Sequence, residues 1–142
     1  DELLDHRVLA ETLETATTWE RLVPTYERVR DALLAQFAAQ GTPAVVQCHI
    51  SHVYAVGASL YFTCVARALA DPVEQWLRVK AAASDAIVST GATITHHHAV
   101  GTDHLPWLTA EVGELGVEVL RSVKATLDPV GVLNPGKLVP PA

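Results

Sequence analysis

Hydrophobic and polar positions along the 142-residue chain follow two different periods, which predicts a mixture of strands and helices. Partial alternation with many threonines favours a strand over 8–18, with a helix as the competing interpretation. β-Branched and aromatic runs predict further strands at 44–54 and 60–66, separated by a turn or bulge around Gly57. The run ATITHHH, residues 92–98, predicts a fourth strand.

Three segments repeat their apolar residues at helical spacing. The first covers about 24–40 and ends before Gly41, a natural helix stop. The second begins with Asp71 as N-cap and Pro72 at the first helical position. The third covers about 106–127 and is followed by a tail rich in proline and glycine, which predicts irregular structure.

The predicted order of elements is β-α-β-β-α-β, followed by a helix and a tail. This order is typical of an α+β, ferredoxin-like fold, in which helices cover an antiparallel sheet. Many functions occur on such a fold, so the function must be argued from the site.

Composition excludes some classes of partner and suggests a cellular compartment. A net charge of −6 with only 10 basic residues argues against nucleic acid as a partner. Two distant cysteines, Cys48 and Cys64, suit a reducing compartment and predict a cytoplasmic location. We find neither a signal peptide nor an apolar run long enough to cross a bilayer.

Three consecutive histidines, His96, His97 and His98, are the main chemical signal in the chain. On a strand, His96 and His98 point to one side and His97 to the other. Packing without chemistry is one interpretation, and a metal site using His104 or the CHISH stretch, residues 48–52, is another. The spacing matches no common zinc signature, so we expect no metal. Histidine suits proton transfer near neutral pH, which is the interpretation we favour.

Tyr61 lies in the strand predicted at 60–66, where most tyrosines pack half-buried with the hydroxyl at the rim. If this strand shares a face with the histidine strand, its hydroxyl could donate a proton or stabilise an oxyanion. The same argument is weaker for Tyr54, which we expect beside the turn.

Three stretches resemble a known family: SHVYAVGASLYFT from Ser51, ITHHHAVGTDHLPWL from Ile94, and the segment from Glu111 to Leu138. They resemble the C-terminal part of FAD-linked oxidases with the vanillyl-alcohol-oxidase fold, and among these the alkyldihydroxyacetonephosphate (alkylglycerone-phosphate) synthases. That family exchanges the acyl group of acyl-dihydroxyacetone phosphate for a fatty alcohol, a step in ether-lipid synthesis, with FAD as cofactor but not as a redox shuttle.

The resemblance implies roles for particular residues. Tyr61 and His96–His98 fall on the catalytic positions, and His98 and Asn134 are expected near the cofactor. The residue after the triplet is often glycine in the family; here it is Ala99, which is tolerable if its φ is negative. A basic residue is often found where this chain has Thr102, so the positive charge for a phosphate must come from elsewhere.

The resemblance also implies that this chain is part of an enzyme and inactive alone. We expect residues 1–127 to form the substrate-side cap domain and 128–142 to return to an FAD-binding domain that precedes Asp1. A lipid-type substrate, peripheral membrane contact through apolar surface, and a homodimer are further expectations. Two rivals remain: an FAD-linked dehydrogenase of a 2-hydroxy acid such as glycolate or D-lactate, and a non-enzymatic ferredoxin-like module that binds a metal or ligand.

Overall fold

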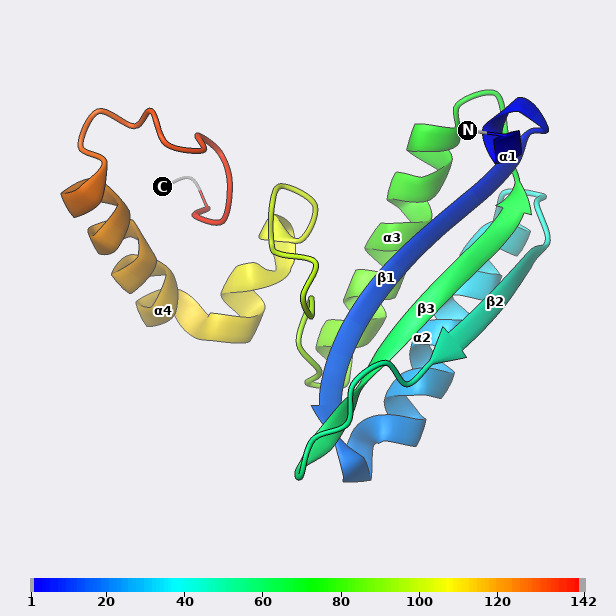
Figure 1. The fold of residues 1–142 in the computed structure, drawn as a ribbon, viewed down its shortest axis with the longest axis horizontal. Coiled ribbons are helices and arrows are strands. Elements are labelled where there is room, and N and C mark those ends of the chain that lie inside the picture. Colours follow the sequence, from blue (N-terminus) through cyan, green and yellow to red (C-terminus); the bar gives the residue numbers. More distant parts are fainter. Residues whose placement is uncertain (1, 141–142) are drawn as a thin grey trace.

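The computed structural model describes residues 2–140 and shows a small sheet with helices on one side (Figure 1). The elements, in chain order, are α1 (Glu2–Asp5), β1 (Val8–Thr18), α2 (Trp19–Ala39), β2 (Ala44–His49), β3 (Gly57–Arg67), α3 (Pro72–Ser89) and α4 (Leu105–Leu127). No helix within 2–140 is long and apolar enough to cross a membrane.

The three strands form one antiparallel sheet in the order β1-β3-β2. Alternation along the paired strands β1 and β3 sends successive side chains to opposite faces. Leu13 lies opposite Phe62, and both are buried on the face that the helices cover. Glu14 lies opposite Tyr61 on the other face, which no helix covers in the described part of the chain (Figure 1).

The core lies between the sheet and the helices α2 and α3. From α2, Val29, Leu33 and Phe37 are fully buried at the spacing of one helix face. The two helices also pack on each other, while α4 extends away from the sheet (Figure 1). One face of the sheet therefore forms the core with the helices, and the other face is not covered by a helix within the described residues.

The α+β class with an antiparallel sheet, covering helices, a C-terminal helix and an irregular tail is confirmed, but the fourth strand is wrong. Residues 92–98 lie where that strand would pair with β1, and they make two bonds to it: Thr93 N to Ala16 O at 3.1 Å and His96 N to Glu14 O at 3.2 Å. Between them, Ile94 N donates to Glu111 Oε2 at 2.7 Å. His97 then takes a positive φ of 60°, which ends any extended run.

Other boundaries moved for local reasons. The first long helix begins at Trp19, five residues before the predicted start, because Trp19 N donates to Val56 O and its indole donates to Ala55 O at 3.2 Å. β2 ends at His49, so 50–56 is a loop, and β3 begins at Gly57. Helix α4 is interrupted at Gly113, whose φ is 74°.

The tail after α4 is irregular as predicted, but a single carboxylate organises its first turn. Asp128 accepts from Val132 N at 3.0 Å and Leu133 N at 2.8 Å, and it pairs with Lys124. The contact with Lys124, together with these backbone N–H groups, lowers the pKa of Asp128 to about 2. The turn is therefore held by an anionic Asp128 over the ordinary pH range.

Candidate active site

A buried carboxylate, Glu14, lies at the centre of the helix-free face. Only 4% of this residue is exposed, although its position on β1 points away from the helices. The loop 50–56 covers it: Ser51 donates to Glu14 Oε1, and Ser51 Oγ lies 2.6 Å from Ser59 Oγ. Two further bonds fold the loop back on β3, His52 N to Ser59 Oγ at 3.0 Å and Ser59 N to His52 O at 2.9 Å.

Glu14 is ionised in this setting. Burial raises its pKa, but the hydroxyls of Ser51 and Ser59 and the ring of His96 outweigh that effect, so the net pKa lies below its ordinary value. An anionic group buried on this face then attracts donors and cations.

Three histidines surround this carboxylate. His96 Nδ1 lies 3.4 Å and His52 Nδ1 3.6 Å from Oε1, while His98 Nε2 lies 3.5 Å from Oε2. These distances exceed those of ordinary hydrogen bonds, so charge and orientation join the groups rather than short bonds. The rings come from two segments far apart in the sequence, the loop 50–56 and residues 96–98.

Two tyrosines contact the outer sides of these histidines. The Tyr54 hydroxyl lies 3.0 Å from His96 Nε2, and the Tyr61 ring meets the His98 ring edge to face, with centroids 5.4 Å apart. His97 stacks on His96 with centroids 3.9 Å apart and meets His52 at 4.6 Å. The cluster thus alternates tyrosine, histidine and carboxylate, an arrangement suited to moving protons.

His96 and His98 both reach Glu14, but the prediction that His97 points the other way is wrong, because its ring stacks on that of His96 and meets that of His52. The physical reason differs from strand alternation, since the segment is irregular. Tyr61 joins the same cluster, while Asn134 lies in a left-handed turn of the tail outside it. Their proposed roles in catalysis and cofactor binding stay predictions.

Sequence reasoning missed Glu14, Ser51 and Ser59 and gave too little weight to Tyr54. Glu14 occupies a position that alternation assigns to solvent, and its partner Ser51 comes from a loop 37 residues away. The available signal was weak, because the threonine- and alanine-rich strand holds two acids, Glu11 and Glu14, and the sequence does not say which of them is buried.

The condition under which alanine would be tolerable after the triplet, a negative φ, is not met: the φ of Ala99 is 62°, in the left-handed region. The turn is held in this conformation because the carbonyl of Ala99 contacts the buried His104 ring, with Nδ1 2.9 Å away. Burial, and then the charge of Lys80, lower the pKa of His104, so this ring is neutral and donates from Nδ1.

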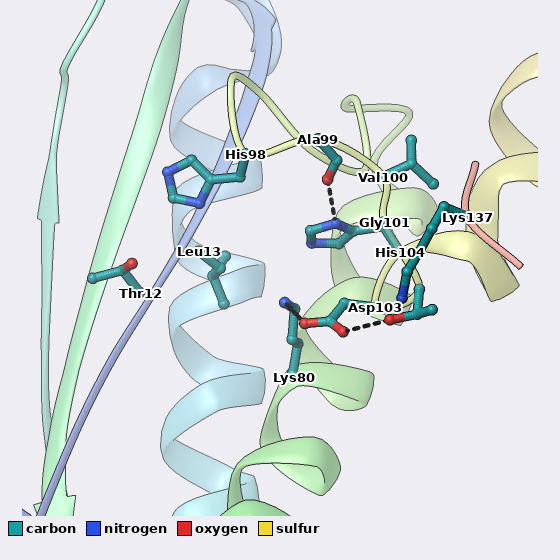
Figure 2. Close-up of a pocket in the computed structure, with 11 residues that line it drawn as sticks. Thr12, Leu13, Lys80, His98, Ala99, Val100, Gly101, Asp103, His104 and Lys137 are labelled. Atoms are coloured by element: carbon teal, nitrogen blue, oxygen red, sulfur yellow. Dashed lines mark hydrogen bonds and ion pairs between the residues drawn. The ribbon is translucent and has the colours of Figure 1, made fainter. Parts of the chain in front are cut away.

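A pocket of about 330 Å³ lies beside the cluster and includes His98 in its lining (Figure 2). Lys80 and Lys137 line it from α3 and from the tail, and Lys80 Nζ pairs with Asp103 at 2.9 Å. That hydrogen bond from Lys80 lowers the pKa of Asp103. Two lysines thus stand near Thr102, but Asp103 lines the same pocket and offsets the charge of Lys80, so Lys137 is the lysine of the lining that has no acid paired with it among the described contacts.

His52, His96 and His97 each offer a ring nitrogen, and these nitrogens lie within 4.8 Å of one another. A metal ion could use such a set. However, His96 and His97 stack almost parallel, at 17° between their planes, so these two rings pack on each other rather than converge on a point. The geometry of the cluster therefore favours proton transfer.

The fold and the site describe an α+β domain whose open sheet face is rich in histidines. Comparison with known families identifies it: the chain belongs to the family of FAD linked oxidases, C-terminal domain, whose model matches residues 1–138. It is similar to alkyldihydroxyacetonephosphate synthases, with 34% identity to that of Dictyostelium discoideum over 99% of this chain and 31% to that of Caenorhabditis elegans over 96%. A solved structure of alkyldihydroxyacetonephosphate synthase matches 97% of the chain with a TM-score of 0.66 and 29% identity.

The chain spans less than a quarter of the length of these proteins, 22–24%. A D-lactate dehydrogenase [cytochrome] of Arabidopsis thaliana is 41% identical, but over only 38% of this chain. Similarity to the synthases is therefore the more extensive of the two.

FAD is the cofactor of this family, and the helix-free face fits such a group. It presents the partly exposed rings of Tyr54, Tyr61 and His98, with hydroxyl and imidazole donors around a buried anion. A planar, hydrogen-bonding group can lie against such rings without displacing any helix. When bound, FAD supplies a flavin ring that can act on a substrate carbon.

Proposed function

We propose that this chain is the substrate-side part of an FAD-dependent alkyldihydroxyacetonephosphate synthase, an enzyme of ether-lipid synthesis. The observation that supports this most is the similarity to such synthases along 96–99% of the chain. In the reaction, the acyl group of acyl-dihydroxyacetone phosphate leaves as a fatty acid and a fatty alcohol takes its place. Carbon–oxygen bonds break and form, and no net oxidation occurs.

The residues of the cluster match the proton transfers that this exchange needs. A base removes a proton from the carbon between ester and ketone, an acid protonates the leaving carboxylate, and a base accepts the proton of the incoming alcohol. We assign the base role to the histidine triplet, with His97 and His98 weighted most. Tyr61 completes the relay through its contact with His98.

For the complete enzyme we propose an FAD-binding domain as the partner of residues 128–142 and of the apolar side of α4. Four exposed residues there follow helical spacing: Leu115, Val119, Val123 and Leu127. We also propose a cytoplasmic location, which the two free cysteines favour, and a peripheral membrane contact, which a lipid-type substrate requires. Homodimer formation stays a prediction.

The test uses the enzyme that contains this chain together with its FAD-binding domain. Mixed anaerobically with acyl-dihydroxyacetone phosphate, it should release free fatty acid and change the flavin absorbance. Tyr61→Phe should slow the release by about 100-fold, because general acid–base catalysis contributes at least this much. Tyr26→Phe, in a tyrosine that stacks on Phe62 beneath the sheet, is the matched control and should keep full activity.

Other outcomes point elsewhere. Flavin bleaching by a 2-hydroxy acid, without fatty-acid release, would move the protein to the dehydrogenases, which share part of the sequence. Stoichiometric zinc in the purified protein would favour a metal-binding module. Full activity of Tyr61→Phe would remove Tyr61 from the relay.

A further inference from the structure

Glu14 faces three histidines of the cluster, yet the proposed mechanism gives it no role. Its two oxygens face the rings of His52, His96 and His98, and each of these rings contacts a tyrosine. We propose that Glu14 is a positioning residue that sets the tautomers of His96 and His98 and so directs which ring nitrogens accept protons, from Tyr54 at His96 and from the adjoining pocket at His98. This rests on the proposed function for its catalytic meaning.

The direction of each proton follows from what a carboxylate can do. An ionised carboxylate accepts hydrogen bonds and donates none. No hydrogen bond joins His96 Nδ1 to the carboxylate, but at 3.4–3.5 Å the negative charge favours the N–H on the ring nitrogen that faces it and the lone pair on the opposite nitrogen. His96 faces Glu14 with Nδ1, and His98 faces it with Nε2. The carboxylate thus favours opposite tautomers in the two histidines.

For His96, the consequence is a continuous relay. With the proton on Nδ1, Nε2 accepts from the Tyr54 hydroxyl, 3.0 Å away. If that proton passes to His96, the ring becomes a cation beside the anion of Glu14, which stabilises the charge. The logic is that of a carboxylate–histidine–hydroxyl triad, with tyrosine in place of serine.

For His98, Nδ1 is the nitrogen left without a proton. The ring lies against that of Tyr61. It also lines the pocket to which Lys80 and Lys137 contribute (Figure 2). One carboxylate therefore prepares two acceptors, Nε2 of His96, which faces the Tyr54 hydroxyl, and Nδ1 of His98, whose ring lines the pocket. The reaction proposed above removes protons at two points, from the substrate carbon and from the alcohol, and two acceptors match that need.

Ser51 keeps Glu14 in place for this task. Its hydroxyl donates to Oε1 and is itself in contact with Ser59, so the carboxylate is held in a fixed orientation between the loop and β3. The hydroxyls of the two serines provide hydrogen bonds to the carboxylate but no positive charge. The negative charge of Glu14 is therefore not neutralised and acts on the histidines.

The sharpest variant is Glu14→Gln in the complete, FAD-loaded enzyme. The amide has nearly the same shape, but one of its two positions becomes an N–H donor. At least one of His96 and His98 then faces a donor and must reverse its tautomer. Imidazole ¹⁵N shifts in ¹⁵N-histidine-labelled enzyme report the tautomers directly, with signals assigned from His96→Gln and His98→Gln variants.

We expect Glu14→Gln to reverse at least one tautomer and to lower fatty-acid release by about 100-fold. The control is Glu11→Gln, an exposed acid on the opposite face of the same strand, which should change neither the shifts nor the activity. Glu14→Asp, which keeps the charge, should retain the wild-type tautomers and more activity than Glu14→Gln.

Unchanged ¹⁵N shifts in folded Glu14→Gln, or full activity, would overturn the positioning role. If tautomers reverse but the wild-type enzyme releases no fatty acid from acyl-dihydroxyacetone phosphate, the positioning role stands and the proposed function fails. The two claims are thereby separated by one set of samples.

Discussion

Ala99 occupies a backbone conformation that favours glycine, and it does so directly after the histidine triplet. A left-handed conformation costs a non-glycine residue about 1–2 kcal/mol. Its φ of 62° is held by the turn that ends at His104. Backbone strain at Ala99 is thus located next to the histidines whose ring orientation the proposed reaction requires.

Ala99→Gly should therefore stabilise the protein. Relief of the left-handed strain exceeds the extra chain entropy of glycine, about 0.5–1 kcal/mol, so we expect a gain of roughly 0.5–1 kcal/mol in the free energy of unfolding. Urea unfolding measures it. Ala125→Gly, in an exposed position of α4, is the control and should lose about 1 kcal/mol. A loss of stability in Ala99→Gly would contradict the strain argument.

At the residue scale, sequence alone identified the groups with the most distinctive chemistry. His96–His98 and Tyr61 came from residue type and family resemblance, and the structure brings them together. Glu14 could not be found in this way, because its burial depends on Ser51 and the histidines, which come from distant segments. Long-range packing of this kind leaves no local pattern in a single sequence.

At the scale of elements, the start of α3 shows how one buried amide joins three segments. Gln75 is almost fully buried. Its amide nitrogen donates to Arg67 O at 3.0 Å and to Thr42 Oγ1 at 3.1 Å, and its oxygen accepts from Leu69 N at 2.9 Å. The end of β3, the turn before β2 and α3 are thereby tied together.

Gln75→Ala should lower the free energy of unfolding by about 2–4 kcal/mol, because it leaves buried polar groups unpaired and opens a cavity. Chemical denaturation of the purified protein measures the change. Gln47→Ala, in an exposed position of β2, should stay within about 0.5 kcal/mol of the wild type. Equal stability of the two variants would show that the Gln75 bonds contribute little.

Elements with strong local signals were predicted well. β1 has the predicted bounds, and Asp71 caps α3 by accepting from Glu74 N at 2.9 Å. The prediction of a fourth strand was wrong. It rested on the β propensity of Ile94 and its neighbours, but tertiary contacts determine the conformation of this segment. Glu111 of α4 binds Ile94 N, which a strand would have paired with another strand. Local preference was overridden by one carboxylate 17 residues away.

For the whole molecule, acid should reduce stability in two stages. The folded-state pKa of His104 lies below its ordinary value of 6.5, so the unfolded chain binds this proton more readily. The contribution of His104 to the free energy of unfolding is therefore fully present above about pH 6.5 and decreases as the pH falls below it. The pKa values of Glu14 and Asp103 are lowered from 4.5 and 3.8, so their contributions are lost later, as the pH falls below about 4.5.

His104→Asn should remove the first stage, since the asparagine amide can still donate to Ala99 O but does not titrate. Thermal unfolding between pH 8 and pH 5 measures the effect: the melting temperature of the wild type should fall across this range more than that of the variant. Parallel decreases in both proteins would assign the first stage to other groups.

The irregular path of residues 93–96 also bears on how copies of the chain behave toward one another. A long outer strand such as β1, with eleven residues, offers unpaired backbone groups to strands of other molecules. Here Thr93 and His96 occupy part of that edge, and Thr15 fastens the segment by donating to Thr93 O at 2.6 Å. The opposite edge strand, β2, has only six residues. The segment that holds the histidines thus also blocks a route to aggregation by strand addition.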